Sequence, residues 1–392
     1  MHILPIASGK GGVGKSLFAA NLAIALGQSG KQVILADLDL GGSNLHLILG
    51  LRNLRSGIGT ILSESKADLE DVVLQTEYKN VRFIPGDAEI PGMANLSAQQ
   101  KKRLLHRISQ LEADYLILDL GAGTTLNTID CFLLSNQGTI VTTPTPTALV
   151  NAYLFLKNSV FRILASAIEK GSPAAAYMDD LHRNVQSLQK IYIQDLLRKI
   201  RELHEPSFQQ VSAALDRFQP RLVMNMLEDP KDADKAHKIR RSCQQYLNIE
   251  LEHLGIMYRD DLQDTALQAG LPIISYKPRA VLSQAIYRIA DKIAQADLEH
   301  PETGRPDLAL MDQSFDTAEM EAEVDFQSKL EYVEDLLQTG ALSAGDLLET
   351  IKNQQLEIGA LRKENMFIKS KLVKAAQLGF NLYAVSRATM MA

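Results

Sequence analysis

A glycine-rich octet near the amino terminus has residue types that suit the binding of phosphate groups. Gly9-Lys10-Gly11-Gly12-Val13-Gly14-Lys15-Ser16 matches the phosphate-binding loop pattern G-x-x-x-x-G-K-[ST]. Residues 3–8 before the octet predict a buried strand, and residues 16–28 after it predict a helix. Backbone N–H groups and the dipole at the start of such a helix favour an anion. Lys15 would contact the β- and γ-phosphates of a nucleotide, and Ser16 would hold Mg²⁺.

Three carboxylates follow predicted strands where they would face this loop. Asp37 and Asp39 lie at the end of the strand predicted over residues 32–37, and side chains two positions apart on a strand point the same way. Asp119 ends the apolar strand predicted over residues 115–119. Ligands of open α/β sheets bind beside the carboxyl ends of the strands. Asp119 thus resembles the Walker B carboxylate of P-loop ATPases, which implies that it would hold Mg²⁺ through water. A solvent-exposed acidic turn is the alternative interpretation of Asp37 and Asp39.

The elements that must position these groups predict an α/β fold. Near-continuous apolar strands alternate with helical stretches, which is typical of a mostly parallel sheet with helices on both faces. Further strands are expected over residues 81–86, 139–143, 221–225 and 254–258. A helix over residues 283–296 would close this domain.

Four segments are predicted along the chain. Residues 1–296 form a P-loop ATPase domain, in which residues 157–217 are a helical insertion with apolar residues at helical spacing; they are Met178, Leu181, Val185, Leu188, Tyr192 and Leu196. Residues 297–316 form a linker with Pro301, Gly304 and Pro306. Residues 317–392 form an acidic helical arm that ends in a basic amphipathic terminus, residues 366–388.

The arm contains a heptad-like series that leaves two interpretations open. The series favours a two-stranded coiled coil with Asn365 at a buried position; its members are Leu347, Ile351, Gln354, Ile358, Leu361, Asn365, Ile368, Leu372 and Ala375. The alternative is one helix that packs on the ATPase domain. The basic terminus would lie on an anionic membrane surface or be the frayed end of the coiled coil.

Composition excludes several other classes of protein. The 392 residues are 46% hydrophobic and 22% charged, with a net charge of −6, so no overall basic field indicates nucleic-acid binding. Cys131 and Cys243 lie far apart and no C-x-x-C motif occurs, which argues against a disulfide framework and against zinc or iron–sulfur sites. We expect no signal peptide, no apolar run of about 20 residues, and a cytoplasmic protein with at most a surface attachment to membrane.

The loop contains a second lysine, Lys10, that a phosphate cradle does not need. The stretch Lys10-Gly11-Gly12-Val13-Gly14-Lys15-Ser16 resembles the deviant Walker A loop of the MinD/ParA family. The resemblance implies that Lys10 reaches across a dimer interface to the nucleotide of the partner subunit. ATP would then join two subunits, and hydrolysis would release them. The nucleotide-binding residues implied here are Gly9, Lys10, Gly11, Gly12, Val13, Gly14, Lys15, Ser16 and Leu17.

The same resemblance implies roles for residues outside the loop. Asp37 would complete the magnesium shell through water together with Ser16 and Asp119, and Asp39 would position the attacking water. Gly121, in the turn Gly121-Ala122-Gly123, would let a backbone N–H approach the γ-phosphate and move when it leaves.

Asn225 would pair with the adenine edge, although a turn-forming asparagine is a fair alternative, and Pro278 would lie in a loop over the nucleotide. Lys10, Lys15 and Mg²⁺ would supply positive charge for a slow, partner-stimulated hydrolysis of ATP.

Two further segments resemble the MinD-like group that includes the flagellar-number ATPases FlhG and FleN. They are residues 39–46, Asp-Leu-Gly-Gly-Ser-Asn-Leu-His, and residues 141–148, Val-Thr-Thr-Pro-Thr-Pro-Thr-Ala, which Asn151-Ala152-Tyr153 continues. The resemblance extends over residues 1–296 except the insertion. The flagellar members carry an amino-terminal extension that we do not expect here, and the insertion and the acidic arm suggest a different cargo or adaptor.

Three functional hypotheses follow. The first is an ATP-switched dimer that positions a flagellum, pilus, chemoreceptor array or division machinery, or regulates its number. The second is a DNA-partition ATPase of the ParA type, for which basic residues would be needed on the dimer surface; candidates are Arg198, Lys199, Arg201, Lys235, Lys238, Arg240 and Arg241. The third is a nucleotide-dependent scaffold that acts through its coiled-coil arm.

Overall fold

The computed structural model describes residues 1–39, 42–51, 57–59, 69–86, 99–100, 107, 110–183, 192–299 and 308–339, together with scattered positions between 345 and 371. The chain divides into two compact units, Met1–Gln327 and Ser328–Ala392. The first unit contains the sheet and all of the candidate site residues.

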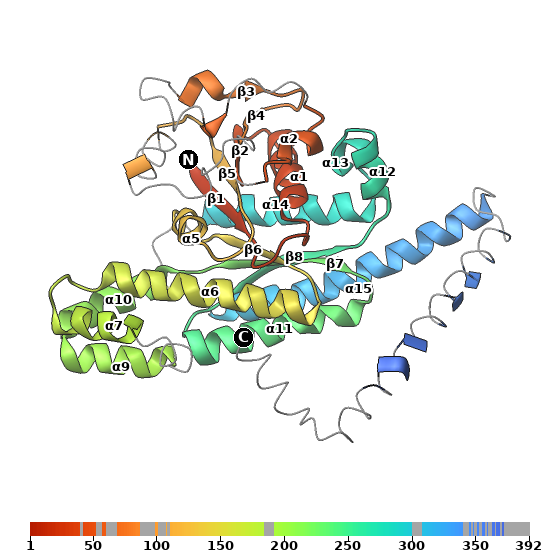
Figure 1. Ribbon diagram of the computed structural model, residues 1–392. Helices are drawn as coiled ribbons and strands as arrows, with labels where there is room; N and C mark the ends of the chain where they lie inside the picture. The colour runs from red at the N-terminus through yellow and green to blue at the C-terminus, as the bar shows by residue number, and fades with distance from the viewer. Residues whose placement is uncertain are drawn as a thin grey trace. The chain divides into compact units, whose positions relative to one another are not determined.

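An eight-stranded sheet forms the centre of the first unit, in the order β3-β4-β2-β5-β1-β6-β7-β8 (Figure 1). The strands are β1 (His2–Ala7), β2 (Val33–Leu38), β3 (Leu74–Gln75), β4 (Val81–Ile84), β5 (Tyr115–Leu120), β6 (Thr139–Thr142), β7 (Arg221–Leu227) and β8 (Glu252–Tyr258). All neighbouring strands are parallel except β3 and β4. The prediction of a mostly parallel α/β sheet is therefore confirmed.

Helices cover both faces of this sheet (Figure 1). The helices are α1 (Lys15–Gln28), α2 (Leu45–Ile48), α5 (Leu126–Phe132), α6 (Pro146–Ala167), α7 (Pro173–Arg183), α9 (Ile193–Leu203), α10 (Glu205–Arg217), α11 (Asp234–Ser242), α12 (Leu262–Gln268), α13 (Ile273–Tyr276), α14 (Val281–Glu299) and α15 (Leu308–Gln338). Short helical turns are η1 (Leu69–Val72), η2 (Pro230–Ala233) and the π-helical η3 (Cys243–Leu247).

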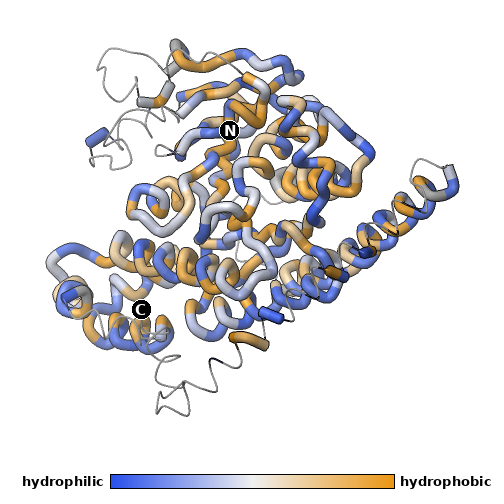
Figure 2. Tube along the Cα trace, turned by 45° about the vertical axis from the view of Figure 1, so that its right-hand side comes forward, coloured by the Kyte–Doolittle hydropathy of each residue, from blue (hydrophilic) through white to orange (hydrophobic). Residues whose placement is uncertain are grey.

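Two hydrophobic clusters occupy the two faces of the sheet. Ile117 of β5 packs with α1 and α14 on one face, whereas Leu116 and Leu118 of the same strand pack with α5, α6 and α10 on the other. Both β2 and β5 are buried along their whole length, which explains why their sequences are apolar without alternation. Figure 2 shows hydrophobic residues along the strands and the helices that pack on them.

The predicted insertion is helical in its described residues. It consists of the end of α6 followed by α7, α9 and α10. Ile193, Leu196 and Ile200 of α9 are buried and belong to the same cluster as the α6 side of the sheet. Val185 and Leu188, two of the residues that predicted helix here, lie outside the described residues.

Helix α6 contradicts the expectation that the chain contains no apolar stretch of about 20 residues. It has 22 residues and is long and apolar enough to cross a membrane by length and composition alone. It packs Phe155, Leu156 and Val160 into the core, and its Arg162 forms an ion pair with Asp130. Buried helices of protein cores meet the same criterion, and we interpret α6 as one of them.

Helix α15 begins at Leu308, within the segment predicted as a linker. Its Met311, Phe315, Ala318 and Ala322 are buried against the sheet domain. The Tyr258 hydroxyl of β8 donates to the carbonyl oxygen of Ala322 at 2.9 Å. Residues 308–327 therefore belong to the first unit, because their apolar face packs on it.

The acidic residues of α15 explain this placement further. Asp312 pairs with Arg240 and Glu319 with His237, both on α11, and Asp325 and Glu321 pair with Arg288 and Lys292 on α14. The acidic composition that suggested a separate arm thus complements basic side chains of the domain.

The remainder of the arm is described only in part. Among the heptad-like positions, Ile351 and Ile368 are helical and exposed, whereas the other members of the series lie outside the described residues. Residues 372–392, which include most of the basic terminus, also lie outside them. The coiled coil and the membrane segment stay predictions.

Replacing Phe315 by alanine tests whether the first part of α15 stabilises the domain. Phe315 is 1% exposed and its ring contacts His237, His253 and Arg240. We expect Phe315→Ala to lower the free energy of unfolding by about 3 kcal/mol, measured by urea denaturation. Met320→Ala is the control, because Met320 lies on the same helix and is 62% exposed. Equal stabilities of the two variants would contradict this packing.

Candidate active site

The phosphate-binding loop connects β1 to α1, and its glycines serve two purposes. Gly12 and Gly14 have φ angles of 78° and 83°, in the left-handed region that glycine adopts without strain. A Cβ atom on Gly9 would lie 2.1 Å from the carbonyl oxygen of Asn151, so glycine lets the loop pack against α6. A Cβ atom on Gly11 or Gly12 would meet no described atom within 4 Å, so this side of the loop faces open space.

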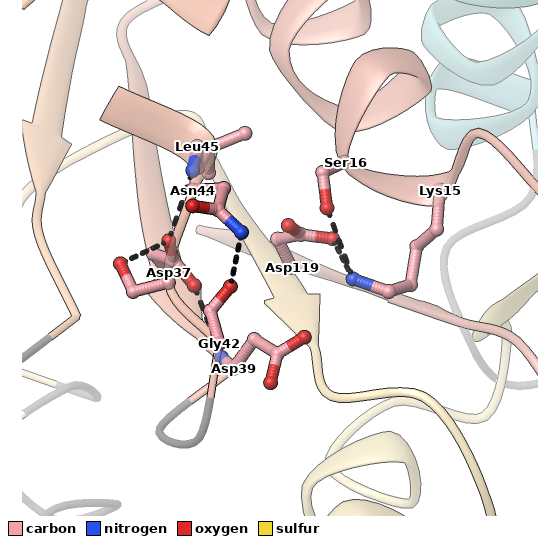
Figure 3. A network of polar contacts seen from close by, with 9 residues as sticks. Lys15, Ser16, Asp37, Asp39, Gly42, Asn44, Leu45 and Asp119 are labelled. Carbon is pink, nitrogen blue, oxygen red and sulfur yellow. Dashed lines mark hydrogen bonds and ion pairs between the residues drawn. The ribbon is translucent and has the colours of Figure 1, made fainter. Parts of the chain in front are cut away.

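Lys15 forms a buried ion pair with Asp119 (Figure 3). Its Nζ lies 2.5 Å from the Asp119 Oδ1 and 3.3 Å from the Ser16 Oγ. Burial raises the pKa of Asp119, and the Lys15 charge opposes that rise. Lys15, Ser16 and Asp119 thus come together as the sequence predicts.

Asp37 lies beside Asp119, because the two residues are paired in register on β2 and β5. The Asp37 Oδ1 accepts the Asp39 N–H at 3.0 Å, and its Oδ2 accepts the Ser43 hydroxyl at 2.6 Å and the Leu45 N–H at 3.3 Å. Burial and the Asp119 charge raise the pKa of Asp37 to about 6. Within the described part of the chain no basic side chain contacts Asp37.

These oxygen atoms suit a magnesium ion. Mg²⁺ binds through carboxylates, hydroxyls and water, and a cation would relieve the repulsion between Asp37 and Asp119. The Ser8 Oγ and Thr142 Oγ1 atoms, from the ends of β1 and β6, are buried without a hydrogen-bond partner in the described structure. The donor set and the open side of the loop therefore fit a magnesium–nucleotide complex.

Asp39 points away from Asp37 toward a different part of the site, so the expectation that the two side chains point the same way is wrong (Figure 3). Asp39 lies past the end of β2, where the alternation of a strand no longer applies. A Cβ atom on Gly121 would lie 3.3 Å from the Asp39 Oδ1, so the two residues are neighbours. Gly123 has a φ of 93°, and its N–H donates to the Ser8 carbonyl oxygen at 3.0 Å. The turn predicted to sense the γ-phosphate thus lies between Asp39 and the start of the loop.

Asn225 contacts the loop itself. Its Nδ2 donates to the Val13 carbonyl oxygen at 2.8 Å, and its Oδ1 accepts the Met226 N–H at 2.8 Å. A Cβ atom on Gly14 would lie 2.2 Å from the Asn225 Nδ2. The structure places Asn225 as a brace for the loop, a contact that the predicted adenine role did not include.

Two other predicted binding residues make only local hydrogen bonds in the described structure. Pro278 lies in the exposed connection between α13 and α14, where its carbonyl oxygen accepts the Gln284 amide, and no hydrogen bond in the described structure joins it to the loop. Leu17 lies half-buried in the first turn of α1, where its carbonyl oxygen accepts the Asn21 amide at 2.8 Å.

Lys10 extends from the loop in another direction. It is exposed, and its Nζ lies 3.3 Å from the Thr147 Oγ1 at the start of α6. In the described structure its ammonium group bonds to Thr147 and not to the Lys15–Asp119 pair, so its role at a nucleotide stays a prediction.

Sequence reasoning missed the residues that hold this site in place. Ser43 and Gly86 surround Asp37, and Asn151 carries the backbone against which Gly9 packs. The contacts of Gly86 and Asn151 join segments distant in sequence, and no spacing rule indicates the contact of Ser43 with Asp37 although the two residues lie in one turn.

Most of the basic residues considered for DNA binding are paired. Arg198, Lys199, Arg201, Lys235 and Arg240 form ion pairs with Asp195, Glu202, Glu205, Asp232 and Asp312, respectively. Lys238 and Arg241 are exposed. Pairing reduces the positive field that these residues would offer to a phosphate backbone.

Comparison with known proteins finds a matching family model and several similar proteins. Residues 1–161 match the ParA family model described as NUBPL iron-transfer P-loop NTPase. The flagellum site-determining protein YlxH of Helicobacter pylori is 30% identical over 261 residues, which cover 59% of this chain and 87% of the relative. The antiactivator FleN of Pseudomonas aeruginosa is 24% identical over 296 residues, which cover 75% of this chain and 86% of the relative.

The fold also resembles a solved structure. The septum site-determining protein MinD from Pyrococcus horikoshii OT3, complexed with Mg-ADP, superposes with a TM-score of 0.50 at 20% identity. The match covers 77% of this chain and 98% of that chain.

Replacing Asp37 by asparagine tests its raised pKa. The folded protein binds a proton at Asp37 near pH 6, whereas the unfolded chain binds it near pH 3.8. Wild-type stability, relative to the variant, should therefore fall as the pH rises from about 4 to above 6, by about 3 kcal/mol in total. Thermal unfolding of both proteins without magnesium, from pH 4.5 to pH 8, measures this difference. A pH-independent difference would contradict the account of Asp37.

Proposed function

Since this chain belongs to the ParA/MinD family of P-loop NTPases, we propose that it hydrolyses ATP with Mg²⁺ and that ATP binding joins two copies of it. The observation that carries the proposal is the buried group of Lys15, Asp37 and Asp119 beside a loop whose glycines suit phosphate binding. These residues combine an ammonium group for phosphate with carboxylates for a divalent cation.

Each of the site residues would have its own role in hydrolysis. Ser16, Asp37 and Asp119 would hold Mg²⁺, which when bound neutralises charge on the phosphates. Lys15 would exchange Asp119 for the β- and γ-phosphate oxygens. Asp39 would orient the attacking water, and the backbone at Gly121 would contact the γ-phosphate. Positioning and charge neutralisation supply most of the catalysis of phosphoryl transfer.

The surface around the loop supports the proposed dimer. Helices α2, α5 and α6 follow the carboxyl ends of β2, β5 and β6, so their first turns surround the site. Leu47, Leu126 and Val150 on these helices are 56%, 66% and 57% exposed. Exposed apolar side chains gathered at one edge are typical of an interaction surface. A second copy packed on it would bring Lys10 of each subunit toward the nucleotide of the other.

The relatives suggest the biological role. FleN is named an antiactivator and YlxH a flagellum site-determining protein. We infer that this chain likewise regulates the number or the placement of a cellular structure. The insertion and the carboxyl-terminal arm are the proposed sites for an adaptor or cargo protein. The proposed location is the cytoplasm, with the basic terminus as the segment that would contact an anionic membrane surface.

Molecular mass in different nucleotides tests the switch. We expect the Asp39→Ala protein to double its mass in Mg-ATP but not in Mg-ADP, measured by light scattering, because it would bind ATP without hydrolysing it. Adding Lys10→Ala should keep it monomeric, since the cross-interface contact is lost. A monomer in Mg-ATP for Asp39→Ala alone would refute the proposal.

The proposed interface is tested by placing a charge on it. Leu126→Glu in the Asp39→Ala background should weaken the ATP-dependent dimer at least about tenfold, because a buried unpaired charge is costly. Leu310→Glu is the control, because Leu310 is 47% exposed on α15, whose Ser314 bonds to His253 near the opposite end of β8. Equal dimerisation of both variants would place the interface elsewhere.

A further inference from the structure

We propose that Ser43 is a positioning residue that orients the Asp37 carboxylate for the magnesium ion. This inference rests on the proposed function, because it assumes that Asp37 serves a magnesium–nucleotide complex. Ser43 lies in the segment that follows Asp39, and no part of the phosphate-binding pattern includes it.

The contact between the two side chains is short and buried. The Ser43 hydroxyl donates to the Asp37 Oδ2 at 2.6 Å. Ser43 is 3% exposed and Asp37 is 1% exposed, so water does not substitute readily for either group. A hydrogen bond to a charged group is stronger than one between neutral groups, and a buried carboxylate that loses a donor is costly.

Gly86 lies close to both Ser43 and the backbone of Asp37. A Cβ atom on Gly86 would lie 3.2 Å from the Ser43 Oγ and 2.8 Å from the Asp37 carbonyl oxygen. Glycine at position 86 therefore lets the chain after β4 approach both residues. This close approach leaves the Ser43 side chain little room to move away from the carboxylate.

The Asp37 carboxylate also ties together the two ends of the turn that carries Asp39. Its Oδ1 accepts the Asp39 N–H at the start of the turn, and its Oδ2 accepts the Ser43 hydroxyl and the Leu45 N–H at the end. Ser43 is the side-chain donor among these three. Its hydroxyl thus helps to fix the orientation of the Asp37 carboxylate, and residues that orient a metal-binding carboxylate typically tune metal affinity.

ATP affinity with and without magnesium tests this role. We expect Ser43→Ala to weaken ATP binding about tenfold at limiting Mg²⁺ and to leave binding in EDTA unchanged. The effect should disappear in an Asp37→Asn background, because the hydroxyl acts through the carboxylate. Titration calorimetry measures these affinities, and circular dichroism reports whether each variant is folded.

Two matched variants complete the test. Asn44→Ala should bind Mg-ATP like the wild type, because the exposed Asn44 amide donates to the Gly42 carbonyl oxygen and not to Asp37. Ser43→Thr keeps the hydroxyl and should retain most of the affinity. Ser43→Cys, whose thiol is a weaker donor, replaces Ser43→Ala if that variant does not fold. Equal losses with and without magnesium, or the same loss in the Asp37→Asn background, would overturn the inference. A wild-type protein that binds no ATP in either condition would overturn the proposed function as well.

Discussion

Two buried carboxylates on neighbouring strands are the constraint on which the site depends. Parallel pairing of β2 with β5 sets Asp37 directly beside Asp119, and Lys15 reaches Asp119 from the first turn of α1. The apolar residues that form the sheet thereby force like charges together in a region of low dielectric. Burial raises the pKa of both carboxyl groups, and the Asp119 charge raises that of Asp37 further; a bound cation would relieve this repulsion.

The surrounding structure serves to hold this charged centre at the edge of a rigid sheet. Gly9 lets the loop touch the backbone of α6, and Asn225 braces the loop from β7. Ser43 and backbone N–H groups satisfy Asp37. The side chains of Lys10 and Asp39 lie outside this network, at the exposed side of the loop and beside Gly121, and the proposal assigns them to the other subunit and to a water molecule.

The strands and the phosphate-binding loop could be predicted from the sequence, because each depends on residues that are close together in the chain. The strands that lead to Asp37 and Asp119 were identifiable because both faces of a parallel strand are apolar, and the loop because its glycines and lysine have fixed spacing. The contacts of Asn225 with Val13 and of Gly9 with Asn151 could not be predicted, because they join residues that only the fold brings together. Strand β3 could not be predicted either, because its two residues are too few to show an alternating pattern of apolar and polar side chains. The acidic residues of α15 suggested a separate arm, but their basic partners on α11 and α14 are distant in sequence.

The central claim is that a lysine of one subunit acts at the nucleotide of the other, and mixing two inactive variants tests it directly. Lys10→Ala and Asp39→Ala should each be inactive alone. A mixed dimer would contain one complete site, in which the Lys10→Ala subunit supplies Asp39 and its partner supplies Lys10. Equal mixing should therefore raise ATP hydrolysis above the sum of the separate variants, up to about a quarter of the wild-type rate where mixed dimers make up half of the dimers. Hydrolysis that stays at the level of the separate variants, although mixed dimers form, would contradict action across the interface.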